Sequence, residues 1–226
     1  EMLHDPKHFD LSAARAANGP PGRYVAESLQ ELVQVAFTAA TSPFEAVRPA
    51  GVATVHDVAL KFGETDDPDY EGKGLLELYG AQLSAALRPC LASDAEPALA
   101  AAGCAAATRY LLAIGSSARG RSVDPVALRK LLSLLTKLGS LSELAGISYP
   151  AYSESAATMV RVAALQASAE LLRAASAPSA PYIELLKQLA PSLPVLRDGW
   201  LALMRDFALL DTGSKPARRA YRPHLY

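Results

Sequence analysis

Eight amphipathic segments follow one another along the chain, and proline, glycine or serine separates each from the next. In the clearest segment, Leu128, Leu131 and Leu135 recur at the three- and four-residue spacing that places side chains on one face of an α-helix. No segment shows a convincing strand pattern, so the chain is expected to be helical throughout. The spacing predicts helices over 24–40, 44–62, 74–91, 95–114, 125–138, 153–175, 182–190 and 195–210.

Composition narrows the fold class further. Alanine and leucine, with 44 and 35 copies, make up about a third of the 226 residues. A chain this apolar is not disordered, and a β-sandwich would require Val, Ile, Thr and aromatic residues in place of Ala and Leu. The formal net charge of −1 disfavours nucleic-acid binding through bulk charge. Thr108 and Arg109 end the most apolar stretch, 98–107, so no apolar run is expected to reach the ~18 residues of a membrane-spanning helix.

The order of the helices indicates how they pack. They fall into serial antiparallel pairs, namely 24–40 with 44–62, 74–91 with 95–114, 125–138 with 153–175, and 182–190 with 195–210. One pair cannot bury a broad apolar face alone, whereas stacked neighbouring pairs can. The sequence therefore predicts an all-α fold, an α-solenoid of about four HEAT/armadillo-like antiparallel helix pairs. The alternative is a compact helical bundle, which the serial pairing and the early or internal prolines disfavour.

Three regions are expected along the chain. Residues 1–22 are polar, end in Gly-Pro-Pro-Gly, and are expected to form a flexible lead-in. The solenoid is assigned to residues 23–210, and residues 211–226 are expected to form a basic tail. The chain begins without an initiator methionine or a signal-peptide pattern, so we expect a piece of a longer protein.

Residues with metal-ligand spacing are few. In the acidic loop after the second helix, Asp67 and Asp69 imitate ligand positions of an EF-hand, but Leu78 stands where the bidentate glutamate is required. His4 and His8 have helical ligand spacing without a third ligand nearby. We therefore expect no metal and no cofactor.

Nucleophile and base pairs are also missing. His56 and Asp57 are neighbours within one helix, so their side chains are expected to point about 100° apart instead of forming a dyad. Cys90 and Cys104 lie in Ala- and Leu-rich surroundings, which predicts buried free thiols and a reducing compartment. We expect no catalytic residue and no enzymatic activity.

Basic side chains are the candidates for partner binding. Three lie on the polar face of helix 125–138 and three in the tail, namely Arg129, Lys130, Lys137, Arg218, Arg219 and Arg222. The alternative is that these charges serve solubility alone. Arg161 falls inside the apolar arc of helix 153–175, where it is expected to snorkel or to pair with an acid of a neighbouring repeat, the alternative being a place in a binding groove.

One segment, 87–102, resembles a HEAT repeat. Pro89 lies in its first helix, Asp94 in its turn, and small residues follow Pro97 in its second helix. Ala98-Leu99 replaces the Val-Arg that usually begins the second helix of such repeats.

Four longer segments, 50–63, 75–91, 153–159 and 201–210, carry a further resemblance. The most specific, 75–91, reads Leu-Leu-Glu-Leu-Tyr-Gly-Ala-Gln-Leu-Ser-Ala-Ala-Leu-Arg-Pro-Cys-Leu. Together, the four segments resemble the very large HEAT-repeat trafficking scaffolds, namely the plant SWEETIE type and the fungal and animal clathrin-adaptor accessory proteins related to it. The resemblance covers roughly residues 46–210, and the segments occur in the same order as in that family.

This resemblance implies a non-enzymatic scaffold segment that supports clathrin-adaptor-dependent membrane traffic between endosomes and the Golgi. It implies other proteins as partners, with clathrin-adaptor subunits or their accessory proteins as candidates, and no nucleic acid. It also implies a cytoplasmic protein that reaches endosomal and Golgi membranes only through those partners. A HEAT or armadillo adaptor of another pathway, for example nuclear transport, and a helical-domain enzyme are the alternatives.

Overall fold

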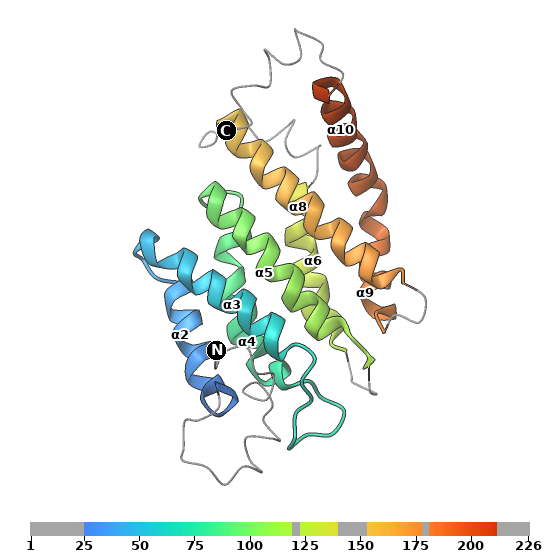
Figure 1. The fold of residues 1–226 in the computed structure, drawn as a ribbon. Helices are drawn as coiled ribbons and strands as arrows, with labels where there is room; N and C mark the ends of the chain where they lie inside the picture. Colours follow the sequence, from blue (N-terminus) through green and yellow to red (C-terminus); the bar gives the residue numbers. More distant parts are fainter. Residues whose placement is uncertain (1–24, 119–122, 140–152, 178–180, 212–226) are drawn as a thin grey trace.

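The computed structural model describes residues 25–118, 123–139, 153–177 and 181–211, and these residues are almost entirely helical (Figure 1). The α-helices are α2 (Leu29–Ala40), α3 (Arg48–Phe62), α4 (Gly80–Leu87), α5 (Pro97–Gly115), α6 (Pro125–Gly139), α8 (Glu154–Ala175), α9 (Ile183–Leu189) and α10 (Leu193–Asp211). Short 3-10 helices, η3 (Val25–Ser28), η4 (Glu45–Val47), η5 (Leu75–Tyr79), η6 (Pro89–Leu91) and η8 (Ala190–Ser192), extend or join them. Within the described residues the only β pairing is an isolated bridge between Asp66 and Gly74.

Proline and short polar side chains explain where the helices begin. Proline lacks an N–H, and it is tolerated in a first helical turn, where that group would have no intrahelical partner. Pro49 and Pro97 occupy such positions in α3 and α5. Asp124 caps α6, because its Oδ1 accepts hydrogen bonds from the backbone nitrogens of Val126 and Ala127 at 2.8 and 3.3 Å.

Two expected helices are divided where the sequence analysis joined them. Segment 44–62 consists of η4 followed by α3, so Pro49 lies in the first turn of α3 and not inside a longer helix. Segment 74–91 consists of η5, α4 and η6, with Pro89 beginning the last piece. In both places the missing proline N–H is accommodated by a new helical start.

The helices form two layers. Helices α2, α4 and α6 make up layer A, and helices α3, α5 and α8 make up layer B, in which they lie side by side and run in the same direction (Figure 1). Layer B is closely packed at each step, since α5 contacts both α3 and α8. Within the pairs, α2 packs on α3 and α6 packs on α8, whereas α5 meets the α4 segment largely through η6. Serial stacking of pairs confirms the predicted all-α solenoid.

The fourth expected pair is arranged differently. Segments 182–190 and 195–210 were expected to lie antiparallel, but α9 and α10 follow one another end to end through η8, which contacts both. The backbone stays in the right-handed helical region at Ala190 and Leu193, so Pro191 and Pro194 bend the chain without reversing it. Helix α10 packs on α8, where Trp200 Nε1 donates a 3.0 Å hydrogen bond to the carbonyl oxygen of Leu165.

Helix α5 lies at the centre of the core. Its buried face contains small residues, among them Ala100, Gly103, Cys104 and Ala107, which let neighbouring helices approach closely. Contrary to the sequence-based expectation, α5 is long and apolar enough to cross a membrane, as no other described helix is. More than half of it is buried among other helices, as in the core helix of a globular fold.

The two cysteines lie in this core as free thiols, as predicted. Burial raises the pKa of the Cys90 thiol to about 11, against a smaller lowering effect of the nearby Arg48 guanidinium. Burial likewise raises the pKa of the Cys104 thiol to about 12. Both thiols are therefore held in the protonated form, which is a poor nucleophile.

Candidate protein-binding surface

Layer A is open between α4 and α6, and we call this opening the main groove. The two helices make almost no contact with each other, although α2 and α4 pack together in the same layer. The groove has a volume of about 580 Å³. Its walls are Glu77, Gly80, Ala81, Ser84, Ala85 and Arg88 on the α4 side, and Asp124, Val126, Ala127, Lys130, Leu131 and Leu134 on the α6 side.

The α4 wall explains why the groove stays unfilled. Residues 77, 80, 81, 84, 85 and 88 recur every three or four positions, so they share one helical face. Along the middle of that face, Gly80, Ala81, Ser84 and Ala85 carry no side chain longer than a hydroxymethyl group. The floor is supplied by α5, through Tyr110 and Ile114. The result is an open channel in which small and apolar side chains alternate with a few polar ones.

One end of the groove is acidic. Glu77 precedes α4 and Asp124 precedes α6, and each accepts a backbone hydrogen bond: Glu77 Oε1 from Gly74 N at 2.8 Å, and Asp124 Oδ1 from Val126 N. The Tyr110 hydroxyl belongs to the same groove and donates to the carbonyl oxygen of Gly80 at 3.4 Å. Burial raises the pKa of Tyr110 to about 12, a hydrogen bond with Ser84 opposes this, and both carboxylates raise it further.

The other part of the groove is basic. Arg88 follows the last residue of α4, and Lys130 lies on the second turn of α6. Both side chains are exposed, and neither forms an ion pair with another described residue. The groove therefore has an acidic end at the start of its two walls and a basic region further along them.

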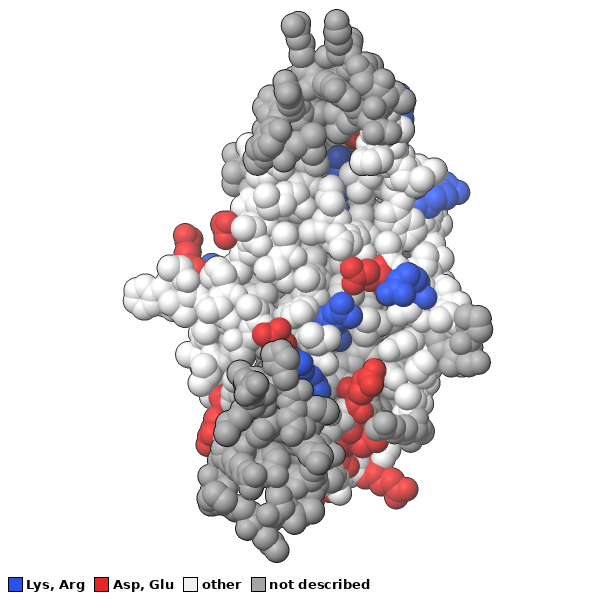
Figure 2. All heavy atoms as spheres, in the orientation of Figure 1, with Lys and Arg blue, Asp and Glu red and all other residues white. Residues whose placement is uncertain are grey.

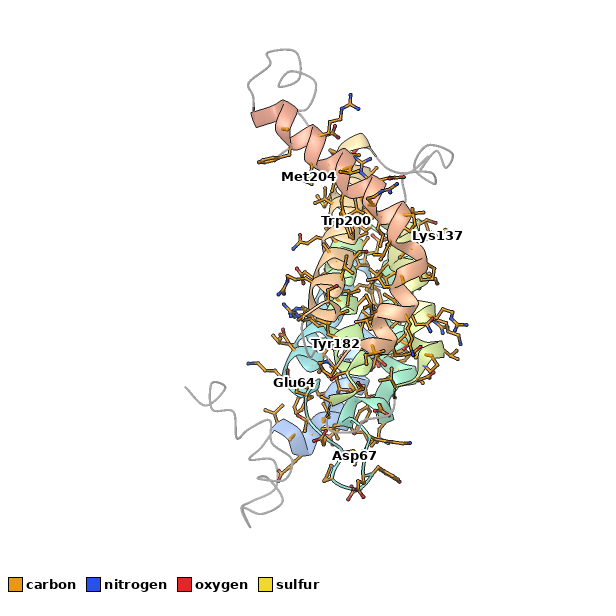
Figure 3. The ribbon with its side chains drawn as sticks, turned by 90° about the vertical axis from the view of Figure 1, so that its right-hand side faces the viewer. Glu64, Asp67, Lys137, Tyr182, Trp200 and Met204 are labelled. Carbon is orange, nitrogen blue, oxygen red and sulfur yellow. The ribbon has the colours of Figure 1, made fainter. Side chains whose placement is uncertain are left out.

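Of the predicted partner-binding residues, Lys130 alone lines this groove. Arg129 lies on the α9 side of α6, where its Nε donates a 3.0 Å hydrogen bond to Gln188 Oε1. Lys137 is exposed near the end of α6, apart from the groove (Figure 3). Arg218, Arg219 and Arg222 lie outside the described residues, as do the lead-in 1–22 and most of the tail. A binding role for these six residues stays a prediction.

A second, smaller groove of about 460 Å³ lies at the carboxyl ends of α3 and α5. Glu64, Arg109 and Tyr182 contribute polar groups to it, and the labelled Glu64 and Tyr182 are visible in Figure 3. A backbone hydrogen bond of 2.6 Å from Ser117 N to the carbonyl oxygen of Pro181 ties the end of α5 to the start of the α9 segment.

The face of layer B is unevenly charged. In Figure 2, red and blue side chains gather over the middle and lower part of this face, and an uncharged band crosses the layer above them. A shallow hollow of about 150 Å³ between α5 and α8 is lined by Arg109, Gln166, Glu170 and several alanines. His56 Nδ1 and Asp57 Oδ1 lie 3.1 Å apart on α3, contrary to the expectation that these neighbours point away from each other.

Helix α10 presents apolar side chains outward. Leu201, Met204 and Phe207 are 57, 67 and 70% exposed, fractions that exceed what a helix packed on both sides would leave. Met204 lies one turn beyond Trp200, which anchors α10 to α8 (Figure 3).

Metal-binding geometry is not found in the part of the chain that the structure describes. Asp67 is buried, and its Oδ1 accepts a hydrogen bond from Asp69 N at 2.8 Å, so the first carboxylate of the expected loop stabilises the turn itself. Arg161 is partly buried on α8, and its buried Nε has no hydrogen-bond partner. The expected pairing of Arg161 with an acid is therefore not observed through this nitrogen.

Sequence reasoning missed the α4 wall of the main groove. Glu77 and Arg88 belong to segment 75–91, which was interpreted as a helix and for its family resemblance but not as a binding surface, and Tyr110 was not singled out. The available signal was the face of small residues at 80, 81, 84 and 85, since such a face either packs closely on another helix or stays open.

Comparison with known proteins places this arrangement among HEAT repeats. The profile of the Laa1/Sip1/HEATR5 HEAT repeat region matches residues 24–209. The protein SWEETIE of Arabidopsis thaliana is 34% identical over 171 residues, which cover 74% of this chain and 7% of SWEETIE. The chain thus spans a small fraction of the length of this relative. No solved structure matches significantly.

Proposed function

The chain belongs to the Laa1/Sip1/HEATR5 HEAT-repeat family, and from this premise we propose that it is a non-enzymatic, protein-binding segment of a long scaffold. The observation that carries the proposal is the family match over 24–209 in a chain that folds as two stacked helical layers. Stacked helix pairs expose long continuous surfaces, and HEAT-repeat proteins use such surfaces to hold other proteins.

The surface chemistry supports binding over catalysis. The main groove is open and has apolar and charged side chains along its walls, which suits a protein segment better than a small reactive substrate. The two thiols that could act as nucleophiles are fully buried and protonated. Other proteins are therefore the proposed partners, and neither a cofactor nor a nucleic acid is part of the proposal.

The more specific proposal concerns membrane traffic. The resemblance to clathrin-adaptor accessory scaffolds supports a role in adaptor-dependent transport between endosomes and the Golgi, with adaptor subunits or their accessory proteins as partners. The parent protein would then be cytoplasmic and would reach these membranes through its partners.

Affinity capture of the tagged full-length parent, together with imaging and fractionation, tests this role. We expect clathrin-adaptor subunits among the captured proteins, and we expect them to decrease when residues 24–209 are deleted. The parent should be found on endosomal and Golgi membranes. A strictly nuclear or secreted distribution without adaptor subunits would remove the trafficking role and leave a HEAT scaffold of another pathway.

A further inference from the structure

The opening between α4 and α6 is a break in an otherwise regular packing scheme. In layer B each helix contacts the next, and in layer A α2 contacts α4, but α4 and α6 are held apart. Packed helices normally lie about 8–10 Å apart, axis to axis. Between α4 and α6 a groove of about 580 Å³ remains instead, with Tyr110 and Ile114 of α5 at its floor, so the α4 and α6 walls are open to a partner at this point.

The walls favour a helix over an extended peptide as the occupant. The backbone hydrogen-bonding groups of α4 and α6 are satisfied within each helix, so the walls offer no edge with which a strand could pair. An α-helix satisfies its own backbone and needs only apolar contact, which the accessible side chains of Ala81, Val126 and Leu134 provide. From Glu77 to Arg88 the wall is about three turns long.

The charges of the groove also give the occupant a direction. Helices α4 and α6 run parallel to each other (Figure 1). Glu77 and Asp124 lie at their starts, and Arg88 and Lys130 lie further along them. A helix of ordinary charge pattern carries acidic residues in its first turn and basic residues in its last turn. Only the antiparallel orientation brings its acids to Arg88 and Lys130 and its bases to Glu77 and Asp124.

We propose that the groove between α4 and α6 binds an amphipathic helix of a partner protein, about three turns long and antiparallel to α4 and α6. The partner helix has an apolar stripe, an acidic first turn and a basic last turn. This inference deepens the proposed function, because it specifies the kind of partner segment that the scaffold recognises.

A selection on purified protein tests the proposal without reference to any cellular partner. A display library of 14-residue peptides would carry Leu at one helical stripe and a free choice of Glu or Lys in the first and last turns. We expect enriched peptides to have Glu in the first turn and Lys in the last. Fluorescence anisotropy should show at least about tenfold weaker binding when these charges are exchanged within one peptide, which corresponds to ~1.4 kcal/mol.

Three variants of the protein locate the binding. Ala85→Trp fills the middle of the groove and should abolish binding. Arg88→Glu combined with Lys130→Glu, both at exposed positions, should keep the fold, as checked by circular dichroism, and reverse the preferred peptide direction. The matched control, Arg173→Glu with Arg205→Glu, changes the same number of charges at exposed positions outside the groove and should leave binding unchanged.

The outcomes separate the two proposals. The groove proposal is refuted if no selected peptide loses its binding to the Ala85→Trp variant. It is also refuted if the Arg88→Glu/Lys130→Glu variant keeps the charge preference of the wild type. Adaptor capture by the intact parent could persist in that case through another surface. Conversely, peptide selection can succeed in a parent that captures no adaptor, which would refute only the trafficking role.

Discussion

Replacement of Gly51 by alanine should destabilise the protein, although alanine is the better helix former. Gly51 lies in the first half of α3, where α3 crosses α2. A Cβ at this position would overlap the backbone nitrogen of Ala40 and would lie 2.6 Å from the Ala39 carbonyl carbon and 2.7 Å from the Ala40 Cα. Carbon atoms pack favourably at about 3.5–4.0 Å, so the two helices would have to separate by about 1 Å.

The sign of the effect follows from two magnitudes. Helix propensity alone would make Gly51→Ala stabilising by up to about 1 kcal/mol. Overpacking costs about 1–3 kcal/mol where flexible side chains can give way, and more where the obstacle is backbone, as it is here. Separation of the helices would also loosen the buried Val33, Val52 and Val55. We expect a net loss of about 2 kcal/mol or more in the free energy of unfolding.

Urea denaturation followed by far-ultraviolet circular dichroism measures this loss. Gly115→Ala is the matched control, because a Cβ at Gly115, the last residue of α5, would meet its nearest atoms at ordinary distances of 3.4 to 3.6 Å. That variant should stay within about 1 kcal/mol of the wild type. If Gly51→Ala is as stable as the wild type, or more stable, then α2 and α3 do not cross as closely as described.

Three further predictions concern the core and the shape. Leu135→Ala, at a fully buried position, should lower the free energy of unfolding by about 2–5 kcal/mol. Lys137→Ala, on the exposed face, should change it by no more than about 0.5 kcal/mol. Equal effects in denaturant melts would show that α6 is rotated relative to our description. Burial raises the pKa values of Cys90, Cys104 and Tyr110 to about 11, 12 and 12. The unfolded chain releases these protons at lower pH than the folded chain does. The contribution of the three groups to the free energy of unfolding should therefore be fully present below about pH 9 and should be lost toward pH 12, by up to ~1.4 kcal/mol per pH unit for each group. A urea midpoint that does not change between about pH 8 and 11 would contradict this. Small-angle scattering should give a radius of gyration above the ~17 Å of a compact chain of this length, and a globular profile at that value would refute the solenoid.

The helices themselves were predictable where caps and periodicity agree. Asp124-Pro125 specifies a start, and the leucines that follow specify a buried face, so helix 125–138 was placed to within one residue of α6. The interruptions at Pro49 and Pro89 were harder to place, because a proline in an apolar run is compatible with a kink, an end or a new start. Only the neighbouring contacts decide among these.

The bent end of the chain and the main groove were not predictable in the same way. Short links normally join antiparallel helices, which is why 182–190 and 195–210 were paired, yet Ala190 and Leu193 keep helical backbone angles and the chain continues in one sense. The face of Gly80, Ala81, Ser84 and Ala85 would equally suit close helix packing. Whether such a face is covered depends on how far α6 is displaced by the rest of the core, which no local pattern encodes.

The central place of α5 has a mechanical consequence. Because α4 and α6 hardly contact each other, most of the packing between the first two helix pairs and the remaining helices passes through α5 and the adjoining η6. On bending, the two parts should therefore rotate about α5, and the groove should widen or narrow as they do. A ligand seated in the groove would restrict this rotation, so a long scaffold built from such helix pairs would change its curvature when it is loaded with partners.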